Sequence, residues 1–188
     1  MNYFDDPANV ASYIKMCEGY DGAEIIAKLQ EYLSPGASLL ELGMGPGTDL
    51  DMLKKTYKAT GSDLSQTFLD IYRKNNPDAD LVLLDAVELK TERTFDCIFS
   101  NKVLHHAAKE DCALSLKNQL RLLNKRGLVC HTFWHGDKIE EHHGLYFKYY
   151  LMDELEGMIP DAFEILTKDL YQEMEPDDSI LMILRKLV

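Results

Sequence analysis

A glycine-rich turn follows an acidic residue in the segment Glu41-Leu42-Gly43-Met44-Gly45-Pro46-Gly47-Thr48. Glycines permit positive φ and carry no Cβ, so a ligand can approach this backbone closely. The turn lies between a predicted strand and a predicted helix, which is where nucleotides bind in open α/β sheets. A tight turn without a ligand is the alternative that the glycines alone leave open. The residues predicted to contact a ligand here are Glu41, Gly43, Met44, Gly45 and Gly47.

Two aspartates follow at spacings that suit the same ligand. Asp63, with Leu64 beside it, lies roughly 20 positions after Gly43, where a carboxylate accepts hydrogen bonds from ribose hydroxyls. Asp85, with Ala86 beside it, ends the next predicted strand and can accept a hydrogen bond from an adenine amino group. The alternatives are helix capping for Asp63 and a local side-chain turn for Asp85.

The spacing of the glycines in the turn indicates which kind of nucleotide would bind. The third glycine falls one residue early for the dinucleotide pattern G-x-G-x-x-G, and the phosphate-binding pattern G-x-x-x-x-G-K-[ST] does not occur. Glu41 would repel a pyrophosphate and attract a cation. The predicted ligand is therefore an adenosine with a positively charged tail.

Three histidines are candidates for proton transfer, because each follows a strand whose carboxyl end would face the ligand. They are His105, His106 and His135. A structural role in the loop is the alternative for His105 and His106, and a place in the pocket wall is the alternative for His135.

A group of aromatic residues near these histidines suits a pocket for a small apolar molecule. Trp134, Tyr146 and Tyr150 are predicted to line this pocket, and Tyr13 and Tyr20 either to close it as a lid or to pack without a role in binding. For Tyr146 and Tyr150 the alternative is a helix that packs its apolar face on the sheet.

No metal centre is predicted. Residues 140–143 combine two glutamates with two histidines, but no i, i+4 histidine pair or cysteine ligand organises them. The four cysteines stand far apart without a C-x-x-C pair. They are expected to be reduced core residues of a cytoplasmic protein, and a disulfide is the alternative.

Short apolar runs alternate with helical patterns along most of the chain, which predicts a parallel α/β sheet. Strands are expected at 38–44, 58–64, 79–85, 95–101 and 127–134, with helices at 48–56, 65–75 and 109–123 between them. One or two helices are expected in 9–33 and another in 144–159. Two final strands, at 163–173 and 179–188, are joined by a short connection, which favours antiparallel pairing.

Charge and length limit the class of protein. The chain has 188 residues, with 32 acidic and 20 basic side chains and a formal net charge of −12. Such a charge repels phosphate backbones and anionic lipid, so neither nucleic acid nor a membrane surface is an expected partner. No apolar run approaches the roughly 20 residues of a membrane span, and the acidic N-terminus does not resemble a secretory signal.

Four segments in order carry a family resemblance: Glu41 to Gly47, Gly61-Ser62-Asp63-Leu64-Ser65, Leu84-Asp85-Ala86, and Phe95 to His106. Together they resemble the class I S-adenosylmethionine-dependent methyltransferases, and most closely the small-molecule branch with the ubiquinone/menaquinone-type enzymes. The resemblance implies a Rossmann-like sheet of seven strands in the order 3-2-1-4-5-7-6, with strand 7 antiparallel and helices on both faces. It also implies that Glu41 and the glycine turn hold the methionine part, Asp63 the ribose, Asp85 with Ala86 the adenine, and Asn101 the region near the sulfonium.

The expected function is methyl transfer from S-adenosylmethionine to a small molecule, aromatic or quinol-like. The alternatives are a non-catalytic module that binds the same cofactor and an NAD-dependent oxidoreductase. One domain is expected over 1–188, with a helical cap or lid at 1–37 and the cofactor-binding core at 38–188.

Overall fold

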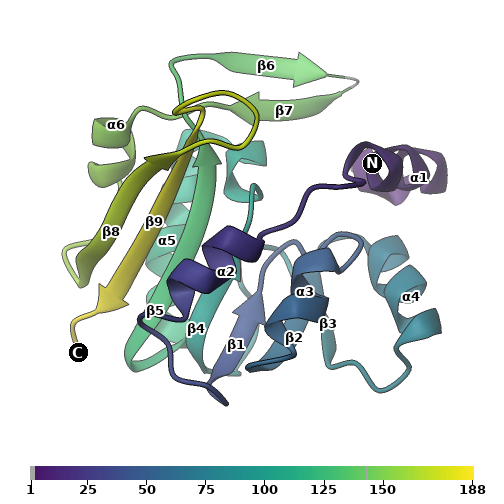
Figure 1. Ribbon diagram of the computed structural model, residues 1–188, viewed down its shortest axis with the longest axis horizontal. Coiled ribbons are helices and arrows are strands. Elements are labelled where there is room, and N and C mark those ends of the chain that lie inside the picture. Colours follow the sequence, from purple (N-terminus) through teal and green to yellow (C-terminus); the bar gives the residue numbers. More distant parts are fainter. Residues whose placement is uncertain (1–2, 143) are drawn as a thin grey trace.

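The computed structural model describes residues 3–142 and 144–188. Its centre is a seven-stranded sheet in the order β3-β2-β1-β4-β5-β9-β8 (Figure 1). The strands are β1 Ser38–Glu41, β2 Lys58–Asp63, β3 Leu81–Leu83, β4 Phe95–Ser100, β5 Leu123–Trp134, β8 Phe163–Tyr171 and β9 Ser179–Lys186. The first five run parallel, whereas β9 is antiparallel to both β5 and β8. The predicted Rossmann-like order, with its seventh strand reversed, is confirmed.

Helices cover both faces of the sheet. Helices α5 (Lys109–Leu122) and α6 (Met152–Glu156) bury side chains against one face, and α2 (Ala23–Leu29) and α3 (Thr48–Leu53) against the other. Leu39 and Leu40 of β1 belong to these two opposite clusters. Successive strand residues point to opposite faces, so a sheet covered on both sides requires nearly continuous apolar runs.

The N-terminal segment lies beside the sheet. Helix α1 (Pro7–Met16) begins where the Asp6 side chain accepts a hydrogen bond from the Ala8 amide at 2.8 Å, with proline at its first position. It packs against α4 (Gln66–Asn75), where the rings of Tyr13 and Phe68 lie 6.0 Å apart. A short 3₁₀ turn, η1 (Tyr3–Asp5), precedes it.

The helix predicted at 144–159 is wrong. Two antiparallel strands, β6 (Ile139–His142) and β7 (Leu145–Lys148), form a separate hairpin, and helix appears only in the short α6. Gly144 has φ of 83°, a conformation that ends regular helix. The aromatic residues of 146–150 also favour a half-buried strand over a helix.

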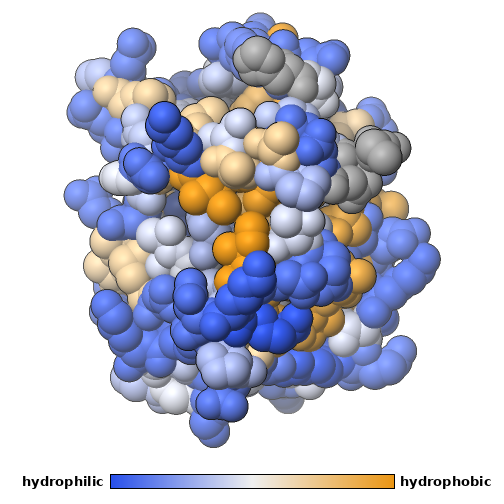
Figure 2. All heavy atoms as spheres, turned by 90° about the vertical axis from the view of Figure 1, so that its right-hand side faces the viewer, coloured by the Kyte–Doolittle hydropathy of each residue, from blue (hydrophilic) through white to orange (hydrophobic). Residues whose placement is uncertain are grey.

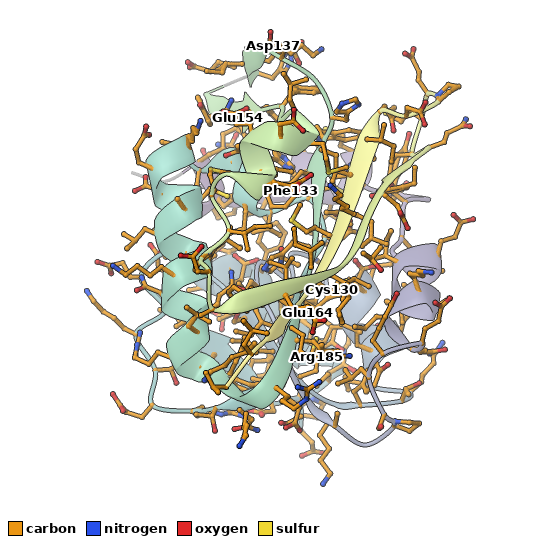
Figure 3. All side chains as sticks on the ribbon, turned by 90° about the vertical axis from the view of Figure 1, so that its left-hand side faces the viewer. Cys130, Phe133, Asp137, Glu154, Glu164 and Arg185 are labelled. Atoms are coloured by element: carbon orange, nitrogen blue, oxygen red, sulfur yellow. The ribbon has the colours of Figure 1, made fainter. Side chains whose placement is uncertain are left out.

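Buried side chains of β5 pack against the segment that follows the β6–β7 hairpin. Phe133 and Cys130 of β5 are buried, and Figure 3 labels them together with Glu164 of β8 and Arg185 of β9. Phe133 packs edge-on against Tyr150, with ring centroids 5.4 Å apart.

Within the described ranges, none of the helices combines the length and apolar character needed to cross a bilayer.

Candidate functional site

A cavity of about 370 Å³ lies at the carboxyl ends of β1, β4 and β5, between the N-terminal segment and the β6–β7 hairpin. Figure 2, which views the side of α1 and α4, shows apolar side chains gathered at the centre of a largely hydrophilic face. The cavity brings together many of the residues singled out from the sequence: Tyr13, Tyr20, Glu41, Gly43, Met44, Gly45, Asn101, His105, His106 and Trp134.

The glycine turn forms one wall of the cavity, and its backbone requires glycine. Gly43, Gly45 and Gly47 have φ of 62°, 49° and 89°. A Cβ at Gly43 would lie 2.6 Å from the Val103 side chain, and one at Gly47 would collide with the Tyr72 ring. The three glycines therefore allow both the left-handed backbone and the close packing around the turn.

Asp63 ties the end of β2 to this turn. Its carboxylate accepts hydrogen bonds from the Gly45 amide at 2.9 Å and the Ser65 amide at 2.8 Å. Burial raises the pKa of Asp63, while these amide hydrogen bonds act in the opposite direction. Leu64 beside it is exposed. The Ser65 contact is a local hydrogen bond over two residues, and Ser65 itself is the N-cap residue of α4, which has no side-chain capping hydrogen bond.

Asp85 and Ala86 lie beyond β3, outside the cavity lining. Asp85 accepts hydrogen bonds from the amides of Val87 at 2.6 Å and Glu88 at 3.1 Å, which is a local side-chain turn. The Ala86 carbonyl accepts a hydrogen bond from Ser115 of α5 at 2.6 Å. Helix α5 thus holds this loop against the sheet.

Glu41 is a buried carboxyl that lacks a complete set of partners. It is 3% exposed, and its Oε2 atom finds no hydrogen-bond partner in the described part of the chain. Burial raises the pKa of Glu41 well above its usual value, and the nearby charges of Asp49 and Asp63 raise it further. A cation bound beside the glycine turn would compensate these carboxylates.

Asp49, in the first turn of α3, was missed by the sequence analysis, although an acidic residue directly after the glycine turn was a usable signal. It accepts hydrogen bonds from the Gly22 amide at 2.7 Å and the Asn101 side chain at 3.0 Å. Thr132 in turn donates to Asn101 at 2.6 Å. These contacts fix the Asn101 amide at the cavity wall.

The two adjacent histidines occupy the far end of the cavity on η2 (Leu104–His106). His105 is 1% exposed, its ring stacks on Phe147 with centroids 5.5 Å apart, and neither ring nitrogen has a hydrogen-bond partner among the described residues. His106 Nδ1 lies 2.8 Å from the Tyr146 carbonyl oxygen. Burial lowers the pKa of both imidazoles.

Lys102, also missed by the sequence analysis, packs its ammonium group over the ring of Trp134. Its ammonium donates to the Phe133 carbonyl oxygen at 3.1 Å and to the Ser179 hydroxyl, and lies 3.7 Å from the centre of the Trp134 ring. Burial lowers the pKa of Lys102 to about 8. Tyr149, which follows β7, stacks on Trp134 with ring centroids 6.2 Å apart.

Several residues singled out from the sequence lie outside the cavity lining: Gly47, Asp63, Leu64, Asp85, Ala86, His135, Tyr146 and Tyr150. Tyr150 is fully buried in the core, and Tyr146 contributes its backbone carbonyl to His106. His135 lies beside the loop before β9, with its Nδ1 atom 2.8 Å from the Asp177 carbonyl oxygen. In the ranges 3–142 and 144–188, no three histidine, cysteine, aspartate or glutamate side chains come together as metal ligands would.

The sequence matches one family model. The model, for a methyltransferase domain, covers residues 39–127. An uncharacterized 37.1 kDa protein in transposon TN4556 of Streptomyces fradiae is 33% identical over 101 residues. That alignment covers 50% of this chain and 29% of the relative, so the chain spans less than a third of the relative's length.

Solved structures share the fold. The 1,6-didemethyltoxoflavin-N1-methyltransferase of Burkholderia thailandensis, solved with S-adenosylhomocysteine, has a TM-score of 0.75 at 19% identity, over 95% of this chain and 85% of that one. A complex of the Haloferax volcanii Trm112 methyltransferase activator with a putative methyltransferase gives a TM-score of 0.78 at 17% identity, over 99% of this chain and 98% of the matched one. The chain therefore has the Rossmann-like fold of methyltransferases.

Proposed function

We propose that this protein is an S-adenosylmethionine-dependent methyltransferase that acts on a small-molecule acceptor. The observation that carries the proposal is the buried, incompletely paired carboxyl of Glu41 beside the left-handed glycine turn. A sulfonium nucleoside with an amino-acid tail suits this arrangement, since it brings positive charge and needs close approach to backbone. The methyltransferase-domain match over 39–127 supports the same reading.

The chain's own residues would divide the cofactor between them. Glu41 and the turn from Gly43 to Gly47, with Met44 in its wall, would hold the methionine part. Asp63 and Leu64 would hold the ribose, Asp85 with Ala86 the adenine, and Asn101 the region near the sulfonium. When bound, the cofactor supplies an electrophilic methyl group with a good leaving group, so the protein's task is chiefly alignment and exclusion of water.

Both oxygens of Asp63 already accept backbone hydrogen bonds, so the ribose hydroxyls would have to bind beside these donors. A carboxylate oxygen has room for more than one donor. The ribose hydroxyls can therefore join the amides of Gly45 and Ser65 without displacing both of them.

The acceptor would bind at the far end of the cavity, against His105, His106 and Trp134. That end is lined largely by aromatic rings, which suits a small aromatic or quinol-like molecule such as those of the ubiquinone/menaquinone-type branch. In the Burkholderia thailandensis structure, an acceptor and S-adenosylhomocysteine are bound together. The N-terminal segment, with Tyr13 and Tyr20 at the cavity, would act as a lid.

We place the protein in the cytoplasm, as an enzyme that does not act on nucleic acid. Cys97, Cys112 and Cys130 are buried free thiols, which suits a reducing compartment. The net charge of −12 opposes binding to a phosphate backbone.

Calorimetric titration tests the cofactor. S-adenosylmethionine and S-adenosylhomocysteine should bind with micromolar affinity, and NAD should not compete. Preferential binding of NAD would overturn the proposal in favour of an oxidoreductase. Binding without transfer of a labelled methyl group to any acceptor in a panel of phenols, quinols, carboxylates and amines would support the non-catalytic module instead.

A further inference from the structure

A chain of buried polar side chains connects two parts of the proposed cofactor site. We infer that His131, in the middle of this chain, is a positioning residue that fixes the loop at Ala86 relative to the end of β4, beside Asn101. The inference rests on the proposed function, which assigns the adenine to Ala86 and the region near the sulfonium to Asn101. His131 is 1% exposed and does not line the cavity, so it acts through its partners.

The chain runs from β4 through β5 and α5 to the loop after β3. Ser100 Oγ lies 2.8 Å from Nδ1 of His131, and Nε2 of His131 lies 2.8 Å from Oε1 of Gln119. The Gln119 amide nitrogen donates to the Ser115 hydroxyl at 3.1 Å, and this hydroxyl donates to the Ala86 carbonyl at 2.6 Å. Each of the four side chains is at most 1% exposed, so the chain is shielded from water along its whole length.

The Ala86 carbonyl determines the direction of every donor in the chain, because it can only accept. Ser115 must donate to it, so the Ser115 oxygen is left to accept from the amide nitrogen of Gln119. The Gln119 oxygen then faces His131, and Nε2 of His131 carries the proton. Burial lowers the pKa of His131 to about 3, which keeps the imidazole neutral, and its unprotonated Nδ1 atom accepts from Ser100.

The end of β4 is held on both faces of the sheet by β5. Ser100 and His131 are partners in the register of the two strands, and their side chains form a hydrogen bond. One residue further along, the Asn101 side chain accepts from Thr132 at 2.6 Å. Successive residues of a strand point to opposite faces, so these two contacts lie on opposite sides of the sheet. The place of Asn101 in the cavity wall therefore depends on both.

Helix α5 holds the loop after β3 at the other end of the chain. Ser115 donates to the carbonyl of Ala86, and three residues further on Asn118 donates to the carbonyl of Val87 at 2.9 Å. Ser115 also accepts from Gln119, so the orientation of its hydroxyl depends on that amide. The position of Ala86 is thus linked to His131.

Loss of the imidazole would release this link. Without the Nε2 proton of His131, the Gln119 amide is free to rotate and present its oxygen to Ser115. Ser115 can then donate to Gln119 in place of the Ala86 carbonyl. The loop after β3 would lose its hydrogen bond to α5, and the adenine its fixed neighbour.

Stability alone does not require such a chain. Hydrogen bonds between neutral groups contribute little net stability, and apolar groups of the same shape can replace a buried pair at little cost. A fully paired buried network instead fixes geometry, because every donor and acceptor has one partner. A geometric role explains why polar groups occupy this part of the core.

Nitrogen NMR of the imidazole tests the direction of the chain. His131 should carry a proton on Nε2 and none on Nδ1, and this state should not change between about pH 5 and pH 8. A proton on Nδ1, or an imidazolium at neutral pH, would contradict the assigned direction and overturn the inference.

Two amide variants separate positioning from folding. His131→Gln keeps an N–H near the position of Nε2, within reach of Gln119, whereas the side chain in His131→Asn is too short to reach it. Calorimetry with S-adenosylhomocysteine is done on the parent protein first, and failure to bind there would overturn the proposed function itself. The dissociation constant should rise at least about 10-fold in His131→Asn and less than about 3-fold in His131→Gln. Equal affinities of the two variants, or the reverse order, would remove His131 from this role.

Ser115→Ala breaks the same chain at its last donor with a smaller change in packing, so it tests the inference even if the variants at His131 do not fold. It should raise the dissociation constant about 5-fold or more. Ser38→Ala is the matched control, because the Ser38 hydroxyl donates to Asp96 at 2.8 Å at the start of β1, outside the cavity lining. Equal cofactor affinities of the two serine variants would contradict a role specific to the chain.

A double variant tests whether the chain acts as one unit. Because either change breaks the same chain, His131→Asn combined with Ser115→Ala should bind S-adenosylhomocysteine within about 2-fold of His131→Asn alone. Losses of binding free energy that add would show two independent effects and would overturn the inference.

Discussion

Buried carboxyls give the site its character at the scale of single residues. Burial raises the pKa values of Glu41, Asp49 and Asp63 together, and each is within reach of the glycine turn or its helix. Such a group of acids is unfavourable in the ligand-free protein and becomes favourable when a cation binds. The arrangement therefore lowers the stability of the ligand-free protein and raises its affinity for a cation.

Glu41→Gln tests both effects of the Glu41 carboxyl, on stability and on cofactor binding. The folded carboxyl keeps its proton to higher pH than the unfolded one, so unfolding releases a proton above about pH 4.5, and the free energy of unfolding falls as the pH rises. The variant should be more stable than the parent at about pH 8 and differ little at about pH 5, while binding S-adenosylmethionine more weakly. Urea unfolding at the two pH values measures the first effect. An equal stability difference at both would contradict it.

Asp63→Ala tests the ribose contact. The variant should weaken cofactor binding by at least about 1 kcal/mol, because a buried charged acceptor is lost. Calorimetry provides the measurement, and Asp78→Ala, at an exposed position, is the control. Unchanged affinity would remove Asp63 from the site.

The residues that sequence reasoning located best are those with local signatures. Glycines that must adopt positive φ and acids at strand ends are visible in the pattern, and the structure places Glu41, Asn101 and both adjacent histidines around one cavity. Asp49 and Lys102 were missed because their roles come from partners more than 25 residues away. Tyr150 was misplaced because an aromatic residue looks the same in a core and in a pocket.

At the scale of elements, the β6–β7 hairpin does most to complete the end of the cavity where we propose that the acceptor binds. Phe147 of β7 covers His105, and the Tyr146 carbonyl meets His106. No sequence pattern distinguished this hairpin from a helix, because a short aromatic run fits both the 3.6-residue period of a helix and the two-residue period of a strand. Nearly continuous apolar runs, by contrast, made the core strands visible in the sequence.

Phe147→Ala tests the hairpin as a wall. Loss of the ring should admit water to His105 and lower kcat/KM for the acceptor about 10-fold, with the affinity for S-adenosylmethionine unchanged. Steady-state kinetics and calorimetry measure the two quantities. The rings that Phe147 contacts are those of His105, His106 and His142, none of which belongs to the glycine turn. A simultaneous loss of cofactor affinity would therefore contradict the separation of the cofactor end of the cavity from the end at His105.

Ser115→Ala tests the support that α5 gives to the loop after β3. The Ser115 hydroxyl donates to the Ala86 carbonyl and accepts from Gln119 at 3.1 Å, in a fully buried position. Removing it should lower the free energy of unfolding by about 1–2 kcal/mol, because both partners lose a hydrogen bond. Chemical denaturation measures this loss, and a change within about 0.3 kcal/mol would contradict it.

At the scale of the whole molecule, strand order determines where the site lies. Parallel strands β1, β4 and β5 end at one edge of the sheet, and the reversed β9 brings the loop with Glu173 to the same edge. The sequence alone indicated the alternation of strands and helices, and the family resemblance supplied the order. The cavity itself depends on contacts between the N-terminal segment, the sheet and the hairpin, which no local pattern encodes.

A crystal structure of the protein with S-adenosylhomocysteine tests the central claim most directly. The account predicts the methionine part against Glu41 and the Gly43 to Gly47 turn, the ribose at Asp63, and the sulfur directed toward His105. Density for the compound elsewhere, or a crevice filled by protein side chains at saturating ligand, would contradict it.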